Sequence, residues 1–395
     1  MTTPMVKAVP FDMPFAARVF VGAGVAGLAA SELERAGVTR PGVVTTRSVA
    51  ATDMFQQWLA GLPSAPPVFS ATRPHTPRET VIAAANYFRE HGCDGFVSFG
   101  GGSAIDTAKG ITLALAGKVE QPSDFDRFKG EWGKTGSFTA FAIDGRMVPH
   151  VAIPTTLSGG AHTFGAGITD AARGEKFVHR HPGLGIRAVL LDPLVTLATP
   201  DSLWTGTGMK ALDHAVEGLY SSVLPPFAEP LRARAFRILM SDLVDSIDRS
   251  RPDLIERRAR VLAASGMSTV STFPLGISHA LGHQAGAAWG VAHAHTTPIF
   301  LPVAVEFNAP AAPAAMRAMA AEIGLQGDDA GALVAERIRA MVKAVGLPGR
   351  LRDAGVKDQS LFEEVAAATL RDSIMFGNPR EATVAEVVGL LQRAY

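Results

Sequence analysis

The order of local patterns along the chain is the feature that most constrains its fold. In the first half, short apolar runs typical of β-strands alternate with segments in which apolar residues recur at helical spacing. The strand-like runs lie at 18–21, 42–46, 67–70, 95–99, 151–154 and 188–191. After about residue 200, the long segments at 231–247, 252–265, 314–323 and 330–345 have helical spacing only. The pattern predicts a parallel sheet covered by helices, followed by a helical domain.

A run of three glycines directly follows one of the predicted strands. Gly100, Gly101, Gly102 and Ser103 come after the 95–99 run and open a predicted helix. Glycines let the backbone approach a phosphate closely, and a helix N-terminus offers unpaired N–H groups and the positive end of the helix dipole. An ordinary tight turn is the structural alternative, but we favour phosphate binding. The earlier GAGVAG at 22–27 is a weaker match, since no Asp or Glu ends the strand that follows it.

Composition and charge exclude several classes of protein. The 395 residues carry 37 Lys and Arg against 37 Asp and Glu, so nothing indicates a nucleic-acid partner. Cys93 is the only cysteine, which excludes an intrachain disulfide and a multi-cysteine metal site. Residues 261–305 carry no Lys, Arg, Asp or Glu, but glycines, prolines and histidines interrupt them, so we expect buried helix rather than a membrane span. The N-terminus lacks a secretory signal pattern, which favours a cytoplasmic location.

Histidines gather in this uncharged region and on one predicted helix before it. Lys210 and His214 are four residues apart and share a helical face, as do His279 and His283, and His293 follows after a break. Three interpretations compete. The imidazoles either bind a metal with one further ligand, or form a metal-free polar site for proton transfer and oxyanion stabilisation, or are hydrogen-bonded core residues. So many histidines in one uncharged region make a purely structural role the weakest of the three.

Several segments together resemble the iron-containing (group III) alcohol dehydrogenase family, which includes the maleylacetate reductases. The resemblance covers nearly the whole chain and rests on GGGSAIDTAK, IPTTLSGG, LLDPLVTLATP, GMKALDHAVEGLYS, HALGHQAGAAWGVAH and FGNPREATVAEV. It implies an α/β, Rossmann-like nucleotide-binding domain with a parallel sheet, followed by an all-α catalytic domain, which is the dehydroquinate synthase-like architecture. We place the NAD(P)-binding domain at 1–197 and the helical domain at 198–395.

One position departs from the metal-binding pattern of this family. Metal-dependent members carry four ligands in GMDAxxH and a later H-x13-H, and the last three match His214, His279 and His293. Lys210 stands where those members have Asp, and an ammonium group repels a metal ion instead of binding it. Maleylacetate reductases also lack the Asp and act without a metal. The resemblance therefore implies a metal-free site, with the three histidines as ligands if a metal is present. Asp213 is expected to point away from the face that Lys210 and His214 share.

The nucleotide-binding residues carry over from the family by position. The resemblance implies that the glycine run holds the pyrophosphate of NAD(P), with Asp106 packed behind it. Arg47 stands where NAD-preferring relatives have Asp, so the 2′-phosphate of NADP is tolerated there. The remaining predicted contacts to phosphates, nicotinamide or ribose come from Thr155, Thr156 and Lys176.

These observations predict an NAD(P)H-dependent reductase of a small oxo-acid such as maleylacetate, with a role in aromatic compound catabolism. Lys210, His214 and the other histidines would stabilise the oxyanion, and His283 or His279 would supply the proton. Two alternatives stay open, namely an iron- or zinc-dependent dehydrogenase of small alcohols and aldehydes, and a non-redox lyase or cyclase on the same fold. We expect a homodimer whose partner is a small oxo-acid or aldehyde, with neither nucleic acid nor membrane involved.

Overall fold

The computed structural model describes residues 18–132, 138–270 and 275–395, apart from the side chains of 131, 132, 138 and 293. The described chain divides into two compact units, which comprise residues 18–200 and 201–395. Each unit is described below by itself.

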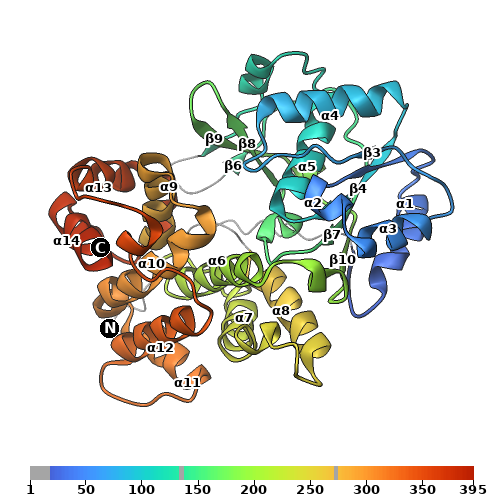
Figure 1. Ribbon diagram of the computed structural model, residues 1–395. Helices are drawn as coiled ribbons and strands as arrows, with labels where there is room; N and C mark the ends of the chain where they lie inside the picture. The colour runs from blue at the N-terminus through green and yellow to red at the C-terminus, as the bar shows by residue number, and fades with distance from the viewer. Residues whose placement is uncertain (1–17, 133–137, 271–274) are drawn as a thin grey trace. The chain divides into compact units, whose positions relative to one another are not determined.

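A six-stranded parallel sheet forms the centre of the 18–200 unit (Figure 1). Its strand order is β1-β10-β7-β4-β2-β3. All six apolar runs in the sequence are strands of this sheet, so the predicted parallel sheet is confirmed. The strands are β1 (Arg18–Val21), β2 (Pro41–Val44), β3 (Val68–Phe69), β4 (Gly95–Gly100), β7 (His150–Pro154) and β10 (Ala188–Leu191).

Helices cover both faces of this sheet because neighbouring strand residues point to opposite sides. In β2, Val43 packs with α1 (Ala29–Arg35) and α3 (Asp53–Ala60), whereas Val44 packs with α4 (Arg78–Glu90) and α5 (Gly102–Ala116). In β4, Phe96 belongs to the core that contains Val44, and Val97 belongs to the core that contains Val43. The two apolar cores account for the nearly continuous apolar runs of the central strands.

Two hairpins and several short helices complete the unit, and the sequence patterns had not indicated the hairpins. β8 (Gly165–Asp170) pairs with β9 (Glu175–Arg180), and β5 (Glu131–Trp132) pairs with β6 (Phe138–Thr139), both antiparallel. β8 is rich in small residues and packs on α5, so its burial comes from tertiary contact rather than from a local pattern. The short helices are α2 (Arg47–Ala50), η1 (Val25–Leu28), η2 (Pro122–Arg127), η3 (Gly159–His162), η4 (Pro182–Leu184) and η5 (Val195–Ala198).

The 201–395 unit is helical throughout its described residues, as predicted. The predicted helix at 231–247 is shorter in the structure. α7 ends at Asp242, whose carboxylate pairs with Arg257 and Arg260 of α8 at 2.6 Å each, and a 3₁₀ turn follows. The helices are α6 (Asp201–Leu219), α7 (Glu229–Asp242), α8 (Leu254–Ser268), α9 (Ile277–Trp289), α10 (His293–Asn308), α11 (Pro313–Glu322), α12 (Ala330–Ala344), α13 (Phe362–Arg371) and α14 (Val384–Ala394), with 3₁₀ turns η6 (Asp245–Ile247), η7 (Ala309–Ala311), η8 (Arg352–Ala354) and η9 (Ser373–Gly377).

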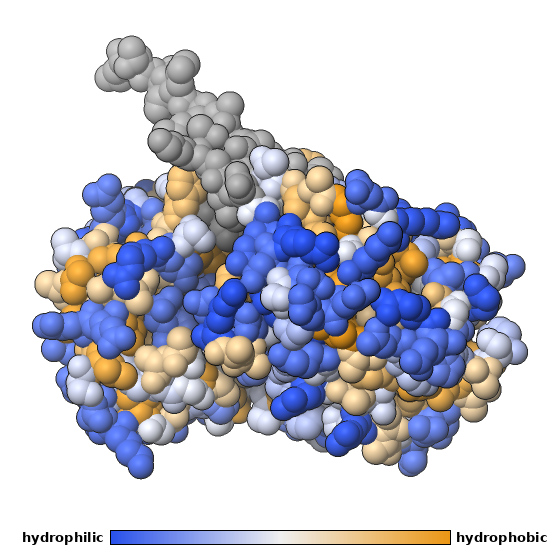
Figure 2. Space-filling view, turned by 90° about the horizontal axis from the view of Figure 1, so that it is seen from above, coloured by the Kyte–Doolittle hydropathy of each residue, from blue (hydrophilic) through white to orange (hydrophobic). Residues whose placement is uncertain are grey.

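The surface shows the usual mixture of polar and apolar groups. On the face in Figure 2, hydrophilic and hydrophobic residues are interspersed. Among the described residues, no helix combines the length and the apolar character that crossing a bilayer requires.

Candidate active site

The glycine run lies at the carboxyl edge of the sheet in the 18–200 unit. β4 ends at Gly100 and α5 begins at Gly102, so the run is the whole connection between strand and helix. No side chain caps the N-terminus of α5, which leaves its first N–H groups available to an anion. Thr155 and Thr156 follow the neighbouring strand β7, whose Pro154 is in register with Gly100. The structure thus brings the two predicted phosphate-binding segments together.

Close approach of these two loops explains why the run consists of glycines. A Cβ atom on Gly101 would lie 3.0 Å from Cγ2 of Thr156, and one on Gly102 would lie 2.8 Å from Oγ of Ser158. Gly100 has a φ of +152°, a conformation that side chains disfavour. The packing of the two loops therefore requires glycine, and the absence of side chains at these positions also leaves room for a phosphate.

Asp106 and Lys176 lie beside each other next to this loop. An added Cβ on Gly167 of β8 would lie 2.4 Å from Cε of Lys176 and 3.2 Å from Oδ2 of Asp106, so the glycine admits both side chains. Burial raises the pKa of Asp106, and the positive charges of Lys176 and Lys109 oppose that shift. Asp106 lies in the first turns of α5, close to Gly160 and Gly167, and its role at the dinucleotide stays a prediction.

Lys109, the last residue of the GGGSAIDTAK motif, was not singled out in the sequence. It is 1% exposed and its ammonium donates to the carbonyl oxygens of Gly160, Thr163 and Gly165 at 2.5–3.0 Å. Burial lowers the pKa of Lys109 to about 8. The side chain ties α5 to the segment after β7 and so fixes the shape of the predicted nucleotide site.

Arg47 and the GAGVAG segment differ in their availability to a ligand. Arg47 is exposed in the first turn of α2, directly after the carboxyl end of β2. In the GAGVAG segment, the N–H of Ala26 donates to Asp192 Oδ2 at 3.0 Å, and the carbonyl oxygen of Ala26 accepts from Trp58 Nε1 at 3.0 Å. Both backbone groups of Ala26 are therefore already hydrogen-bonded within the protein, in agreement with the weak match of GAGVAG to a dinucleotide fingerprint.

The predicted histidine cluster is built by α6 and α9 of the 201–395 unit. The rings of His214 and His279 stack with centroids 4.9 Å apart, and the rings of His279 and His283 lie 6.4 Å apart. His293 begins α10, but its side chain lies outside the described part of the chain. Lys210 lies one turn before His214, and its side chain is 15% exposed.

Asp213 does not point away from the cluster, and the expectation from helical spacing is wrong here. Its Oδ2 lies 2.8 Å from Nδ1 of His279 and 3.9 Å from Nζ of Lys210. Thr297 of α10 donates to the same oxygen at 3.1 Å. Spacing along α6 alone cannot reveal this arrangement, since α9 and α10 bring their polar groups to the flank of α6 on which Asp213 lies.

Glu217 is a second carboxylate that the sequence analysis missed. It is fully buried on α6, and it accepts the backbone N–H groups of Gly276, Ser278 and His279 at 3.0, 2.8 and 3.3 Å. Its Oε2 also lies 2.9 Å from Nδ1 of His279. Glu217 therefore caps the N-terminus of α9 from a distant helix and orients the His279 ring at the same time. Glu217 lies in GMKALDHAVEGLYS, one of the segments on which the family resemblance rests, and this was the signal in the sequence that could have indicated it.

The protonation of the cluster follows from these contacts. Burial disfavours the charged form of His279, but the carboxylates of Asp213 and Glu217 outweigh it and raise the pKa of His279. Burial alone would raise the pKa of Asp213, but the positive charge of His279 outweighs burial, so the pKa of Asp213 is lowered. Burial, together with the charges of His279 and Lys210, brings the pKa of His214 well below its usual value. The surroundings therefore favour the neutral form of His214 and the protonated form of His279.

His283 has its own carboxylate partner. Its Nδ1 donates to Oδ2 of Asp372 at 2.8 Å, and its side chain is 42% exposed. The other oxygen of Asp372 accepts the N–H of Ile374 at 3.0 Å, which fixes the carboxylate at the start of η9. The hydrogen bond places Nδ1 of His283 against the Asp372 carboxylate and so fixes the orientation of the ring. Sequence reasoning missed Asp372, which is 89 residues from His283.

Comparisons with known proteins agree with this geometry. The iron-containing alcohol dehydrogenase model matches residues 16–193, and the C-terminal model of the Fe-containing alcohol dehydrogenase family matches residues 205–395. "Probable alcohol dehydrogenase EutG" of Escherichia coli (strain K12) is 33% identical over 80% of this chain and 76% of its own length. The chain belongs to the iron-containing alcohol dehydrogenase family.

Further members of the family resemble the chain over nearly its full length. Maleylacetate reductase of Pseudomonas sp. (strain P51) is 29% identical over 97% of this chain and 96% of its own length. The crystal structure of a 1,3-propanediol oxidoreductase covers 98% of this chain and 100% of its own, with a TM-score of 0.87 and 25% identity. The chain is an NAD(P)-dependent oxidoreductase of the kind that interconverts alcohols and carbonyl compounds.

The family's metal can be tested against the side chains of this dehydrogenase. Asp213, Glu217 and His279 offer ligand atoms within 4.8 Å of one another. However, the oxygens of Glu217 already accept three backbone N–H groups, and Nδ1 of His279 is engaged with both carboxylates. Lys210 brings a positive charge to within 3.9 Å of Asp213. These engaged atoms fit a divalent cation poorly, whereas Nε2 of His279 and Nδ1 of His214 are buried without a hydrogen-bond partner among the described residues.

Proposed function

We propose that this dehydrogenase is a metal-independent, NAD(P)H-dependent reductase of small oxo-acids such as maleylacetate. The observation that carries the proposal is the position of Lys210 at the histidine cluster. Its Nζ lies 3.9 Å from Oδ2 of Asp213, the same oxygen that lies 2.8 Å from Nδ1 of His279, so a side-chain cation of the protein stands beside this carboxylate. The similarity to maleylacetate reductases over more than nine-tenths of the chain supports the same substrate class.

Residues of the 18–200 unit would hold the dinucleotide. The N–H groups at the start of α5 would bind the pyrophosphate next to Gly100, Gly101, Gly102 and Ser103. Thr155, Thr156, Asp106 and Lys176 would contact the phosphates, nicotinamide or ribose, and Arg47 would accommodate a 2′-phosphate. When bound, the reduced nicotinamide supplies the hydride that the carbonyl carbon receives. We assign this role to residues 1–197 and catalysis to 198–395.

Residues of the 201–395 unit would handle the charge and the proton. As the carbonyl carbon is reduced, negative charge develops on its oxygen, and the ammonium of Lys210 would donate a hydrogen bond to that oxygen. His214, neutral and stacked on His279, would line the same site. The alkoxide would then take the Nε2 proton of His283 or of His279 in its doubly protonated form, which leaves that ring neutral and gives the hydroxy acid.

Asp372 would act as a positioning residue for His283. Its carboxylate holds Nδ1 of the ring and is itself fixed by the backbone of Ile374. Burial lowers the pKa of His283, and the hydrogen bond to the Asp372 carboxylate opposes that shift and fixes the direction in which the ring points. Both rings are held through Nδ1 by carboxylates, so either His283 or His279 would present Nε2 to the substrate.

Two other functions remain distinguishable from this proposal. A metal-dependent alcohol dehydrogenase would use His214, His279 and His293 as ligands, and relatives such as lactaldehyde reductase make alcohols and aldehydes the natural substrates to compare. A lyase or cyclase would bind NAD(P) without net oxidation of NAD(P)H. A homodimer, a cytoplasmic location and a role in aromatic catabolism stay predictions from the sequence.

The decisive experiment combines elemental analysis with kinetics. Protein purified without chelators is analysed for zinc, iron and other metals, and oxidation of NADH and NADPH is followed with maleylacetate and with lactaldehyde, before and after chelation. Negligible metal and unchanged maleylacetate reduction are expected, together with a fall of about 10²–10³ in kcat for Lys210→Met. Stoichiometric metal whose removal abolishes activity would contradict the metal-free site. Reduction of neutral aldehydes but of no oxo-acid would contradict the substrate class.

A further inference from the structure

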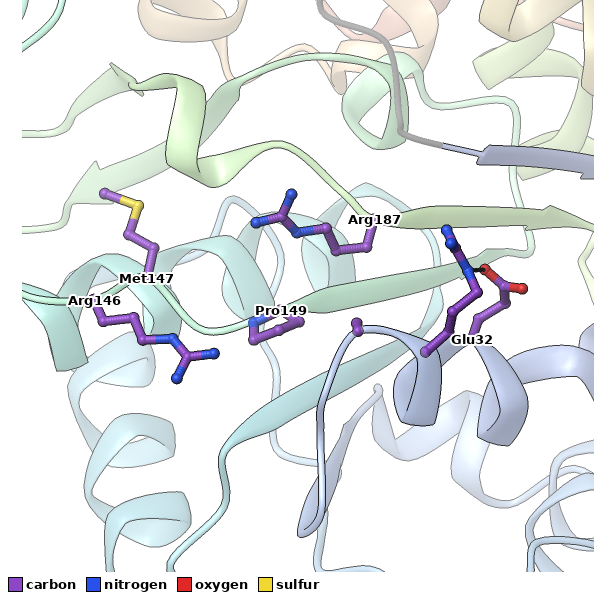
Figure 3. A pocket seen from close by; sticks show the side chains of 7 residues that line it. Glu32, Arg146, Met147, Pro149 and Arg187 are labelled. Atoms are coloured by element: carbon purple, nitrogen blue, oxygen red, sulfur yellow. Dashed lines mark hydrogen bonds and ion pairs between the residues drawn. The ribbon is translucent and has the colours of Figure 1, made fainter.

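A pocket lies at the opposite edge of the sheet from the predicted cofactor site. Its volume is about 260 Å³, and Glu32, Arg35, Arg146 and Arg187 are among the residues that line it (Figure 3). Arg35 ends α1, and Arg187 directly precedes β10. Arg146 lies shortly before β7, the parallel neighbour of β10. The pocket therefore opens at the amino ends of these strands, whereas the glycine run follows the carboxyl end of β4.

Positive charge exceeds negative charge around this pocket. Three arginines face one carboxylate, Glu32, whose side chain is only 7% exposed. That carboxylate is already shared, because it pairs with Arg18 at 2.7 Å and with Arg35 at 3.4 Å. Glu32 therefore fixes the side of the pocket formed by α1 and β1 and has no capacity left for the other arginines.

Arg146 and Arg187 lack a counter-charge of their own. Both side chains are exposed, and neither makes a side-chain hydrogen bond or ion pair with any residue in the described ranges. Figure 3 shows them reaching from two separate segments to either side of Pro149. The exposed guanidinium groups of Arg146 and Arg187 are therefore available to an anion that enters this pocket.

We propose that this pocket binds a small phosphate dianion, either free phosphate or a phosphate ester with a short carbon chain. Guanidinium groups match the geometry of phosphate oxygens with paired N–H donors, and two unpaired arginines suit a doubly charged group. A pocket of about 260 Å³ has room for a phosphate group and a short carbon chain. Met147 and the buried ring of Pro149 provide an apolar floor for those atoms.

Calorimetric titration of the full chain tests this site. The protein is first saturated with whichever of NAD⁺ and NADP⁺ binds more tightly, so that phosphate cannot occupy the cofactor loop. Inorganic phosphate, glycerol 3-phosphate and malonate are then titrated at one fixed ionic strength, because salt screens such contacts. The double variant Arg146→Gln/Arg187→Gln is compared with Arg317→Gln/Arg337→Gln, which removes the same charge from two exposed arginines of the helical unit.

Saturable binding of one phosphate compound per chain is expected, weakened at least about tenfold by the pocket variant and less than about twofold by the control. Tighter binding of glycerol 3-phosphate than of phosphate identifies an ester as the ligand, and equal binding identifies free phosphate. The proposal is overturned if the pocket variant leaves the affinity unchanged, if both variants weaken it equally, or if malonate binds more tightly than either phosphate compound. None of these outcomes depends on the proposed reductase activity.

Discussion

Replacement of Glu217 by Gln is the sharpest test of how the catalytic helices are held. In the native protein the carboxylate accepts the N–H groups of Gly276, Ser278 and His279 and contacts the ring of His279. Glutamine keeps one accepting oxygen, which can serve about two of these donors, and turns an NH₂ group toward the rest. One or two buried donors then lose a charged acceptor, which is worth about 1.5–3 kcal/mol for each bond.

The expected cost is about 3–5 kcal/mol of unfolding free energy, because one partner of a buried charged network has been removed. For a unit of this size, that corresponds to a fall of roughly 6–20 °C in Tm. Urea and thermal unfolding followed by circular dichroism would measure it. Glu229→Gln is the matched control, since Glu229 is exposed at the start of α7 and its loss should cost at most about 0.5 kcal/mol. A Glu217→Gln protein within about 1 kcal/mol of the native stability would refute the role of Glu217 as a distant cap.

Three further predictions concern other positions. Asp372→Asn should lower kcat about 10–100-fold with little change in KM. It should also move the alkaline limb of the pH profile to lower pH, because the Asp372 carboxylate opposes the lowering of the His283 pKa by burial. An unchanged alkaline limb would show that Asp372 acts only structurally. Burial raises the pKa of the Cys93 thiol from 9.0 to about 11, so iodoacetamide at pH 8 should alkylate it about 100-fold more slowly in folded than in urea-unfolded protein, and equal rates would contradict this. Burial opposes ionisation of Asp94, but hydrogen bonds from Thr39 and the backbone of Arg40 lower its pKa. Asp94→Asn should therefore cost about 1 kcal/mol or less at pH 7, and this cost should shrink as pH falls below about 4, whereas a constant difference in urea unfolding across pH would exclude the linkage.

Local patterns in the sequence were sufficient to predict the strands of the parallel sheet, because its central strands are buried on both faces. Their apolar runs stand out from the polar segments around them, and the glycine run marks the turn where a strand becomes a helix. The β8–β9 hairpin had no such signal, since β8 contains small residues whose burial depends on α5.

The candidate site was predictable in its residue types but not in its connections. Helical spacing placed Lys210 and His214 on one face correctly, and it misplaced Asp213 because the packing partner of that flank comes from other helices. Glu217 and Asp372 act on histidines 62 and 89 residues away, a separation over which no local pattern carries information. Such partners become visible only when the chain is folded.

The interlocked loops after β4 and β7 have a consequence for protein engineering. Gly101 and Gly102 leave the space that Thr156 and Ser158 fill, so neither loop can be exchanged for a bulkier relative by itself. A chimaera that takes the first loop from another member of the family must take the second loop with it. Libraries that aim to alter dinucleotide preference should therefore leave both segments intact and vary Arg47, which is exposed in the first turn of α2.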